Sequence, residues 1–511
     1  MIAAMRGALR VDGRRLLAAW AQSARSAARR WEFWALLAVL ALALILRVWW
    51  VSYAAREPQG LHDPSLYYFY GHQISNGNGY TVPDLATAQQ LAPELVRQAL
   101  EKGSSLISNG QPTAYYPIGY PAALGGVYAL VKHTPIPDNF VLANAYFNVF
   151  LGVATVGLLY GVGRRLFNVY VGLLAALWLA VFPNLIYHTS SFLTETLFNF
   201  LIMAALLVLL APDWRERPLS RTRLAVFGVM LGLSALVRPI SLLFLPLLLI
   251  VWLATGIGWR RSLAQTGVAL AAGVAVIMPW SIRNFVVMDA PVFISTNLGD
   301  DLCIGHHPGA SGHFEFGDYC FNDAKYEGLD RKTFEVRRNN DDTRLAVKFA
   351  VHHPGAELKL LSRKAWYTWW QHDWDGLWAA ESYGDDVFMD PNTRQNLRDI
   401  ATGFFHVSIV IGGLGLLGFV LSPRDPRRIF FLLALLAFAG VPLVFFGDAR
   451  FHVPAIPLLM VAAAWAVVYT AQLVPKLVVV QPPDAGERPS GAVEVAEGER
   501  PVAEQDALQD A

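Results

Sequence analysis

The sequence predicts an all-α, polytopic membrane protein: a bundle of about ten transmembrane helices with two large extracytoplasmic segments. Of its 511 residues, 54% are hydrophobic and only 16% are charged, which is more apolar than an ordinary soluble domain. Apolar runs of about 20 residues recur along the chain, each long enough to cross a bilayer. The net charge of +1 gives no support for nucleic-acid binding, so we expect membrane lipids and no nucleic acid among the partners.

The apolar runs give the expected spans. The first follows an arginine-rich leader and has no small-residue cleavage pattern after it, so we interpret it as a retained signal anchor. The predicted spans are residues 33–53, 140–162, 170–186, 192–211, 224–237, 240–257, 263–280, 400–421, 429–446 and 453–473.

Arginines in the short connections test this set of spans. The leader is rich in arginine, which places it in the cytoplasm by the positive-inside rule. Threading the spans from there puts the basic connections at 164–165, 215–223, 260–261 and 424–428 on the same side. A missed span would invert every later connection, so this agreement supports the predicted topology.

The spans divide the chain into five parts: a basic cytoplasmic leader (1–32), an N-terminal transmembrane module (33–280) with a large first outer loop (54–139), an extracytoplasmic segment (281–399), C-terminal transmembrane helices (400–473) and a cytoplasmic tail (474–511). The tail is rich in Pro, Gly, Ala and Glu, which predicts disorder. The extracytoplasmic segment is either helical or mixed α/β. It holds both cysteines, Cys303 and Cys320, and a disulfide there fits an oxidising compartment, although two cysteines alone do not establish it.

Four arginines depart from the topology pattern, because Arg47, Arg238, Arg283 and Arg450 fall near the outer membrane interface. Each one alone is explained by a side chain that reaches lipid headgroups. Four at one depth favour a shared anion, and the planar guanidinium group fits a phosphate. Charged groups at membrane depth usually have a partner or face a water-filled cavity.

Two acidic residues, Asp63 and Glu195, are expected at the same level. A carboxylate beside arginines stays ionised and can act as a general base. The structural alternatives are helix capping by Asp63, which precedes Pro64, and a helix N-terminal role for Glu195.

Six segments, in this order, resemble the GT-C superfamily of integral-membrane glycosyltransferases. They are "LHDPSLYYFYGHQISNGNGY" from Leu61, "PTAYYPIGYPAAL" from Pro112, "SSFLTETLF" from Ser190, "ALVRPISLLFLP" from Ala235, "MPWSIRNFVVMDAPVFISTNLGDDLCIGHHPGASG" from Met278 and "DARFHVPAIPLL" from Asp448. The resemblance covers about residues 34–473 and is closest to the bacterial branch related to protein O-mannosyltransferases and the lipid A aminoarabinose transferase (glycosyltransferase family 39-like).

The resemblance implies a GT-C-like bundle that moves a sugar from a polyprenyl-phosphate-linked donor to an acceptor hydroxyl of a glycan, lipid or protein, usually with inversion. It implies a bacterial cytoplasmic (inner) membrane, with the active site facing the periplasm or exterior. Asp63 matches the expected catalytic base, and Arg283, Arg238, Arg450 and Arg47 are the candidates for binding the donor phosphate. Many relatives carry a second acid in the first loop where this chain has Pro64, so Glu195 is the candidate for the second carboxylate.

The same motifs supply candidates for substrate binding: His62, Tyr67, Tyr115, Tyr116, Asn284 and His188. Some superfamily members use a divalent metal and others do not, so no cofactor is assigned. Two alternatives stay open: a flippase or transporter for a lipid-linked sugar, and a surface-glycan polymerase or ligase that uses a diphosphate-linked donor. Transporters place charged sites near the bilayer midplane, whereas these charges gather at the outer rim, which favours the enzyme.

Overall fold

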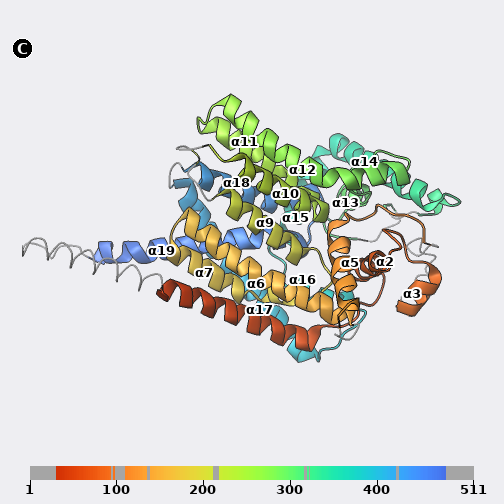
Figure 1. The fold of residues 1–511 in the computed structure, drawn as a ribbon, viewed down its shortest axis with the longest axis horizontal. Helices are drawn as coiled ribbons and strands as arrows, with labels where there is room; N and C mark the ends of the chain where they lie inside the picture. The colour runs from red at the N-terminus through yellow and green to blue at the C-terminus, as the bar shows by residue number, and fades with distance from the viewer. Residues whose placement is uncertain are drawn as a thin grey trace, which may run out of the picture. The chain divides into compact units, whose positions relative to one another are not determined.

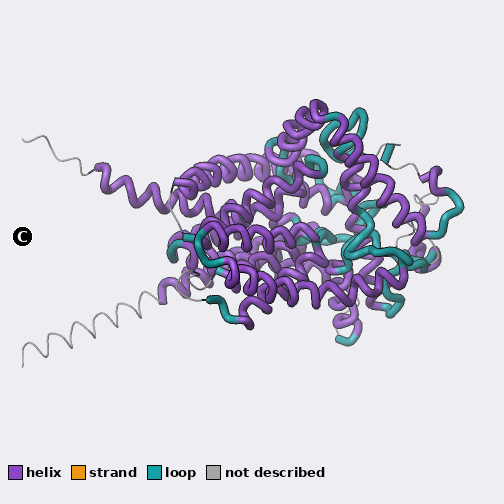
Figure 2. The backbone as a smooth tube through the Cα atoms, turned by 90° about the horizontal axis from the view of Figure 1, so that it is seen from above, coloured by secondary structure: helices purple, strands orange, loops and turns teal. Residues whose placement is uncertain are grey.

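The computed structural model describes residues 30–91, 93, 96–97, 110–134, 139–210, 214, 218–315, 319–320, 323–421 and 425–478. Most of the predicted leader and tail lie outside these ranges. Residues 1–468 form one compact unit and 469–511 another, and the elements below are those of the first unit and of the helix that ends it. The described residues form helices and loops with no β-strand (Figure 2), so the all-α class is confirmed and the mixed α/β alternative for 281–399 finds no support.

The helices differ widely in length, and their bounds are as follows. The first is Arg30–Ala54. It is followed by α2 (Asp63–Ser75), α3 (Leu85–Leu91), α5 (Gly119–Lys132), α6 (Phe140–Leu166), α7 (Val169–Ala180), α8 (Pro183–Tyr187), α9 (Glu195–Leu209), α10 (Arg221–Val237), η1 (Pro239–Leu243), α11 (Phe244–Ala254) and α12 (Trp259–Val287). The remainder are α13 (Leu298–Gly305), η2 (Asp323–Tyr326), α14 (Arg331–His352), α15 (Pro354–Trp369), α16 (Asp375–Ala380), η3 (Ser382–Gly384), α17 (Pro391–Leu421), α18 (Pro426–Gly440), η4 (Val441–Val444), η5 (Ala449–Ala455) and α19 (Ile456–Val478).

Among the described residues, six helical stretches are long and apolar enough to cross a membrane, which supports a multi-pass membrane protein. They are Arg30–Ala54, Phe140–Leu166, Trp259–Val287, Pro391–Phe419, Pro426–Val444 and Ala449–Leu473. Three shorter apolar helical stretches, Val169–Ala180, Glu195–Leu209 and Pro239–Ala254, coincide with further predicted spans. The 17 residues of α10 coincide with the fifth predicted span, 224–237. Each predicted span is therefore helical over most of its length, while the number of crossings stays a prediction.

Several predicted spans are broken at the ends that are predicted to face outward. The third divides where α7 ends at Ala180 and α8 restarts at Pro183, since proline fits the first turn of a helix better than its interior. In the fourth predicted span, 192–211, the helix begins only at Glu195, the first residue of α9. The last opens with η5, which contains Pro454, before α19. These breaks bring polar side chains such as Glu195 and His452 into the interior of the protein, where both are fully buried.

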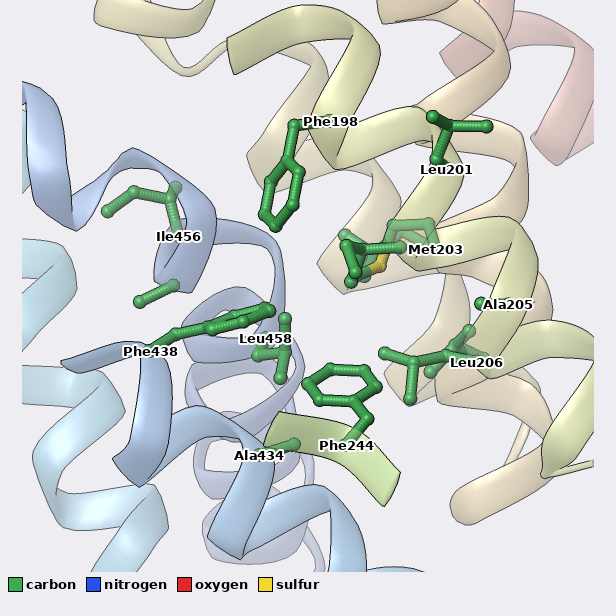
Figure 3. Packing of buried hydrophobic residues seen from close by; sticks show 14 of the residues in the cluster. Phe198, Leu201, Met203, Ala205, Leu206, Phe244, Ala434, Phe438, Ile456 and Leu458 are labelled. Carbon is green, nitrogen blue, oxygen red and sulfur yellow. The ribbon is translucent and has the colours of Figure 1, made fainter. Parts of the chain in front are cut away.

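The core joins helices from both ends of the chain. Figure 3 shows Phe198 and Leu206 of α9 facing Phe244 of α11 and Phe438 of α18, with Leu458 of α19 beside them. The ring centroids of Phe244 and Phe438 lie 5.1 Å apart. Helix α9 is thus packed between segments that are distant in sequence, which positions its first residue among them.

Glycines allow α10 and α12 to pack side by side (Figure 1). A Cβ atom at Gly228 would lie 2.2 Å from the carbonyl oxygen of Ala269, and one at Gly232 would lie 2.7 Å from that of Gly273. Small residues four apart let two membrane helices approach closely. This contact fixes α10, and Arg238 follows directly at its C-terminal end.

The predicted disulfide is present between Cys303, in α13, and Cys320, whose Cα atoms lie 5.7 Å apart. It ties the loop that follows α13 back to that helix.

Candidate active site

Asp63 is held by two partners at the start of α2. Its Oδ1 atom accepts a hydrogen bond from the Tyr116 hydroxyl at 2.5 Å, and Oδ2 lies 2.5 Å from Nη1 of Arg450. The N-cap residue of α2 is His62, and no side chain caps the helix there. The Asp63 side chain keeps 29% exposure. Its carboxylate is therefore fixed by tertiary contacts and does not serve as a cap.

Glu195, the first residue of α9, is a fully buried carboxylate between two arginines. Its Oε1 atom pairs with Nη2 of Arg238 and with Nε of Arg450. Nε of Arg238 also donates to the Thr194 hydroxyl at 2.8 Å. A buried charge left without a partner is costly, and here two guanidinium groups share that one carboxylate.

Asp63, Arg450, Glu195 and Arg238 thus form one connected set, called here the charge cluster. Its two carboxylates and two guanidinium groups balance in formal charge. The arginine side chains are 14% exposed for Arg238 and 13% for Arg450. In the part of the chain that the structure describes, Nη1 of Arg238 and Nη2 of Arg450 have no hydrogen-bond partner. The charge cluster therefore has N–H donors left to bind an anion.

Arg450 is positioned by the short helix η5. Asp448 caps that helix by accepting from the Arg450 backbone N–H at 2.8 Å. Two residues after Arg450, the Nε2 atom of His452 lies 2.8 Å from Oδ1 of Asp373. The same oxygen accepts a hydrogen bond from Nδ2 of Asn184 at 2.5 Å. Asp373, in the segment predicted to be extracytoplasmic (281–399), thus anchors both η5 and α8.

Tyr116 is positioned by a buried carboxylate of α14. Glu335 accepts from the Thr113 hydroxyl at 2.5 Å and from the Ala114 backbone N–H at 3.0 Å, while pairing with Arg331 at 2.7 Å. Burial, reinforced by the charge of Asp63, raises the pKa of Tyr116 well above its usual value. The hydroxyl therefore stays protonated and acts as a donor to Asp63.

The other two predicted phosphate ligands bind backbone carbonyls. Arg283 donates to the carbonyl oxygens of Thr113 and Tyr80, both at 2.8 Å. Arg47 is 1% exposed and donates to the carbonyl oxygen of Ala180 at 3.0 Å. Ala180 ends α7, and carbonyls at a helix C-terminus lack helical partners and carry partial negative charge. Of the four arginines, the structure brings only Arg238 and Arg450 into the charge cluster.

Two of the predicted substrate-binding residues flank the charge cluster. The ring centroid of Tyr67 lies 4.9 Å from that of Tyr116. His62 precedes Asp63, and its Nε2 lies 3.0 Å from Oδ2 of Asp385.

The remaining candidates for substrate binding either form hydrogen bonds outside the charge cluster or are buried. Tyr115 donates to Oδ2 of Asp300 at 2.6 Å. Asn284 is fully buried and accepts from Arg283 at 3.0 Å. His188 is 1% exposed, and neither ring nitrogen has a hydrogen-bond partner among the described residues.

Two further acids near the charge cluster escaped the sequence analysis. Burial, with added repulsion from Asp300 and Asp63, raises the pKa of Asp301 to about 8. Burial beside Asp448 likewise raises the pKa of Asp375 well above its usual value. The acidic pairs in "GDDL" and "HDWD" are the only sequence signal for these residues, and nothing in their spacing places them near Asp63.

No group of three or more His, Cys, Asp or Glu side chains within the described ranges is arranged to hold a metal ion. The adjacent histidines of "GHHPGASG" have separate partners: Nδ1 of His306 lies 2.9 Å from Oε2 of Glu357, and His307 stacks on Tyr319 at 5.1 Å.

Comparison with known families matches residues 136–282 to the model described as dolichyl-phosphate-mannose-protein mannosyltransferase. This segment contains Glu195 and Arg238 of the charge cluster. No curated protein sequence matches the chain.

Among solved structures, the oligosaccharyltransferase AglB from Archaeoglobus fulgidus, in complex with an inhibitory peptide and a dolichol-phosphate, is 15% identical at a TM-score of 0.48, covering 88% of this chain and 51% of its own. The chain therefore spans about half the length of that protein. ArnT from Cupriavidus metallidurans bound to undecaprenyl phosphate is 14% identical at a TM-score of 0.35, covering 88% of this chain and 81% of its own. The family match over residues 136–282 agrees with the resemblance to GT-C glycosyltransferases seen in the sequence, and the long apolar helices support a multi-pass membrane protein.

Proposed function

We propose that the protein transfers a sugar from a polyprenyl-phosphate-linked donor to an acceptor hydroxyl on the extracytoplasmic face of a bacterial cytoplasmic membrane, with inversion and with Asp63 as the general base. The observation that carries this proposal is the charge cluster. It sets a partly exposed carboxylate beside two arginines that still have free N–H groups.

Asp63 has the geometry that a base requires. Each carboxylate oxygen has two lone pairs, and Tyr116 and Arg450 occupy one on each oxygen. The remaining lone pairs can accept the proton of the acceptor hydroxyl. As the acceptor oxygen bonds to C1 of the sugar, the bond from C1 to the phosphate oxygen breaks and the proton passes to Asp63. Positioned base catalysis of this kind contributes about 100- to 10,000-fold in rate.

The two arginines suit the leaving group. Negative charge grows on the lipid phosphate as the C1–oxygen bond breaks, and donors fixed in advance stabilise it without reorganisation. Glu195 holds Arg238 and Arg450 through one oxygen, so their free Nη atoms are preset for phosphate oxygens. In this proposal Glu195 aligns the arginines and takes no proton.

The family match supports the donor class, because the name of the matched model specifies a sugar carried on a polyprenyl phosphate. The arginine-rich connections support the orientation, since the positive-inside rule predicts that they face the cytoplasm and that the charge cluster lies on the opposite side.

The test is transfer of radiolabelled sugar by the purified full-length protein. Donors are undecaprenyl monophosphates and diphosphates carrying glucose, galactose, mannose or aminoarabinose, and acceptors are the lipid, polysaccharide and protein fractions of bacterial envelopes. We expect transfer from a monophosphate-linked donor. Transfer only from diphosphate-linked donors would favour the polymerase or ligase alternative. Passage of donor across a vesicle bilayer without any transfer would favour the flippase.

A further inference from the structure

A shallow cavity of about 580 Å³, open to the surface, lies on the segment predicted to be extracytoplasmic (281–399), and none of its lining residues belongs to the charge cluster. It is lined by Ser311, Ser362, Arg363, Trp366 and Tyr367. This volume is within the range of small-molecule binding sites.

One face of α15 builds most of this cavity. Its four lining residues are spaced i, i+1, i+4 and i+5, which places them on one side of a helix. The opposite side of α15 packs inward through Leu360, Lys364 and Thr368, all buried. Gly312, with a φ of +95°, lets the loop that carries Ser311 approach, because a Cβ atom there would lie 2.8 Å from Cβ of Arg363.

The lining side chains combine a free cation, aromatic faces and hydroxyl groups. Arg363 is exposed and has neither an ion pair nor a hydrogen bond with any described residue. Trp366 is 53% exposed beside it. A guanidinium group binds a phosphate or carboxylate, an aromatic face packs on the apolar side of a sugar ring, and the serine hydroxyls can bond to sugar hydroxyls.

Both walls of the cavity pack on the stretch that carries Arg450. On the α15 side, a Cβ atom at Gly447 would lie 2.8 Å from Cβ of Tyr367. On the loop side, the Gly447 backbone N–H donates to the carbonyl oxygen of Gly312 at 2.8 Å. Gly447 is three residues before Arg450, so a ligand in the cavity lies on an element that joins directly to the charge cluster.

We infer that this cavity binds the acceptor, and that the acceptor is a saccharide bearing a negative charge. The role as acceptor site rests on the proposed function, because a lipid-linked donor reaches the charge cluster from the membrane while a saccharide approaches from outside. A phospholipid headgroup would satisfy Arg363 but would leave the ring faces and hydroxyl groups without a sugar to contact.

The binding test uses the purified full-length protein without donor, so it does not depend on turnover. Equilibrium dialysis measures binding of radiolabelled glucose 1-phosphate, with glucose and inorganic phosphate as competitors. We expect Arg363→Ala to weaken binding by about tenfold or more, as the loss of a charge-assisted hydrogen bond should, and Trp366→Ala to weaken it by about fivefold. The matched controls are Arg337→Ala, an exposed arginine of α14, and Trp259→Ala, an exposed tryptophan of α12 that does not line the cavity. Both should bind normally.

Three results would overturn the inference: no binding of glucose 1-phosphate, competition by inorganic phosphate as strong as by the unlabelled sugar phosphate, or loss of binding in nanodiscs that contain phosphatidylglycerol. The last would identify a lipid-headgroup site. In a transfer assay, the Arg363 variant should raise KM for the acceptor and leave KM for the donor unchanged. Normal binding without any transfer would count against the proposed function and not against the cavity as a saccharide site.

Discussion

Asp63 and Arg450 are 387 positions apart in the chain, yet their side chains lie 2.5 Å from each other. One belongs to the first outer loop and the other to the helix that opens the last predicted span. The contact requires the first and last parts of the membrane bundle to be assembled together. The charge cluster therefore depends on the whole fold, although Asp63 itself lies at the start of a local helix.

Tyr116→Phe removes the hydroxyl that orients Asp63 and keeps the ring. We expect kcat to fall by about tenfold, the effect of losing one hydrogen bond to a charged group, while the thermal midpoint changes little. Tyr128→Phe is the matched control, because the buried Tyr128 hydroxyl has no partner among the described residues. An equal loss of activity in both variants would show that the effect is not specific to Asp63.

Glu195→Gln removes the carboxylate that two arginines share. Breaking a buried ion pair by deleting one partner costs about 3–5 kcal/mol, so we expect a clear drop in the free energy of unfolding. Thermal unfolding in detergent measures it. Exposed Glu327→Gln should change stability by less than about 0.5 kcal/mol. A Glu195→Gln variant as stable as the wild type would mean that the arginines do not depend on this carboxylate.

Replacing Cys303 and Cys320 by serine opens a covalent loop with a sequence separation of 17 residues. Loop-closure entropy predicts a loss of about 3 kcal/mol in the free energy of unfolding. Labelling with a thiol reagent before and after reduction checks the bond in the wild type. Full labelling of unreduced, folded protein would show that the disulfide does not form.

We expect Asp301 to make stability depend on pH. Burial beside Asp300 and Asp63 raises its pKa from the usual 3.8 to about 8. Between these values the folded protein holds a proton that the unfolded chain releases, so this residue's contribution to stability falls as pH rises from about 4 to 8. Asp301→Asn should flatten that decline in the thermal midpoint.

The control for Asp301 is Asp341→Asn. The hydrogen bond from Lys325 lowers the pKa of Asp341, so its contribution is lost as pH falls and adds nothing to a decline between pH 4 and 8. Identical pH profiles for wild type and Asp301→Asn would contradict the burial of a protonated carboxyl at this position.

The sequence predicted the helical bundle well, because apolar length and arginine placement report directly on membrane crossing. It also singled out Asp63, Glu195, Arg238 and Arg450, whose residue types are costly at that depth without partners. It could not distinguish Arg238 and Arg450 from Arg47 and Arg283, because in the sequence all four arginines fall near the predicted outer membrane interface. The two pairs differ because of packing, since Arg47 and Arg283 donate hydrogen bonds to nearby backbone carbonyl oxygens.

Tyr116 could not be distinguished in advance from the other tyrosines of the outer loop. Its position depends on Glu335, more than 200 residues later, which holds the preceding turn. Asp301 and Asp375 were missed for a related reason. Their burial comes from the fold of the outer segment, and no helical or strand periodicity encodes it.

The most direct test of the central claim compares transfer by wild type, Asp63→Asn and Asp385→Asn. Asparagine keeps the size of Asp63 and removes its basic carboxylate, while Asp385 is a nearby carboxylate that contacts His62 and lies outside the charge cluster. We predict that Asp63→Asn lowers kcat by at least about 100-fold with donor binding retained, and that Asp385→Asn stays close to wild type. Transfer by Asp63→Asn at the wild-type rate would contradict the assignment of Asp63 as the base.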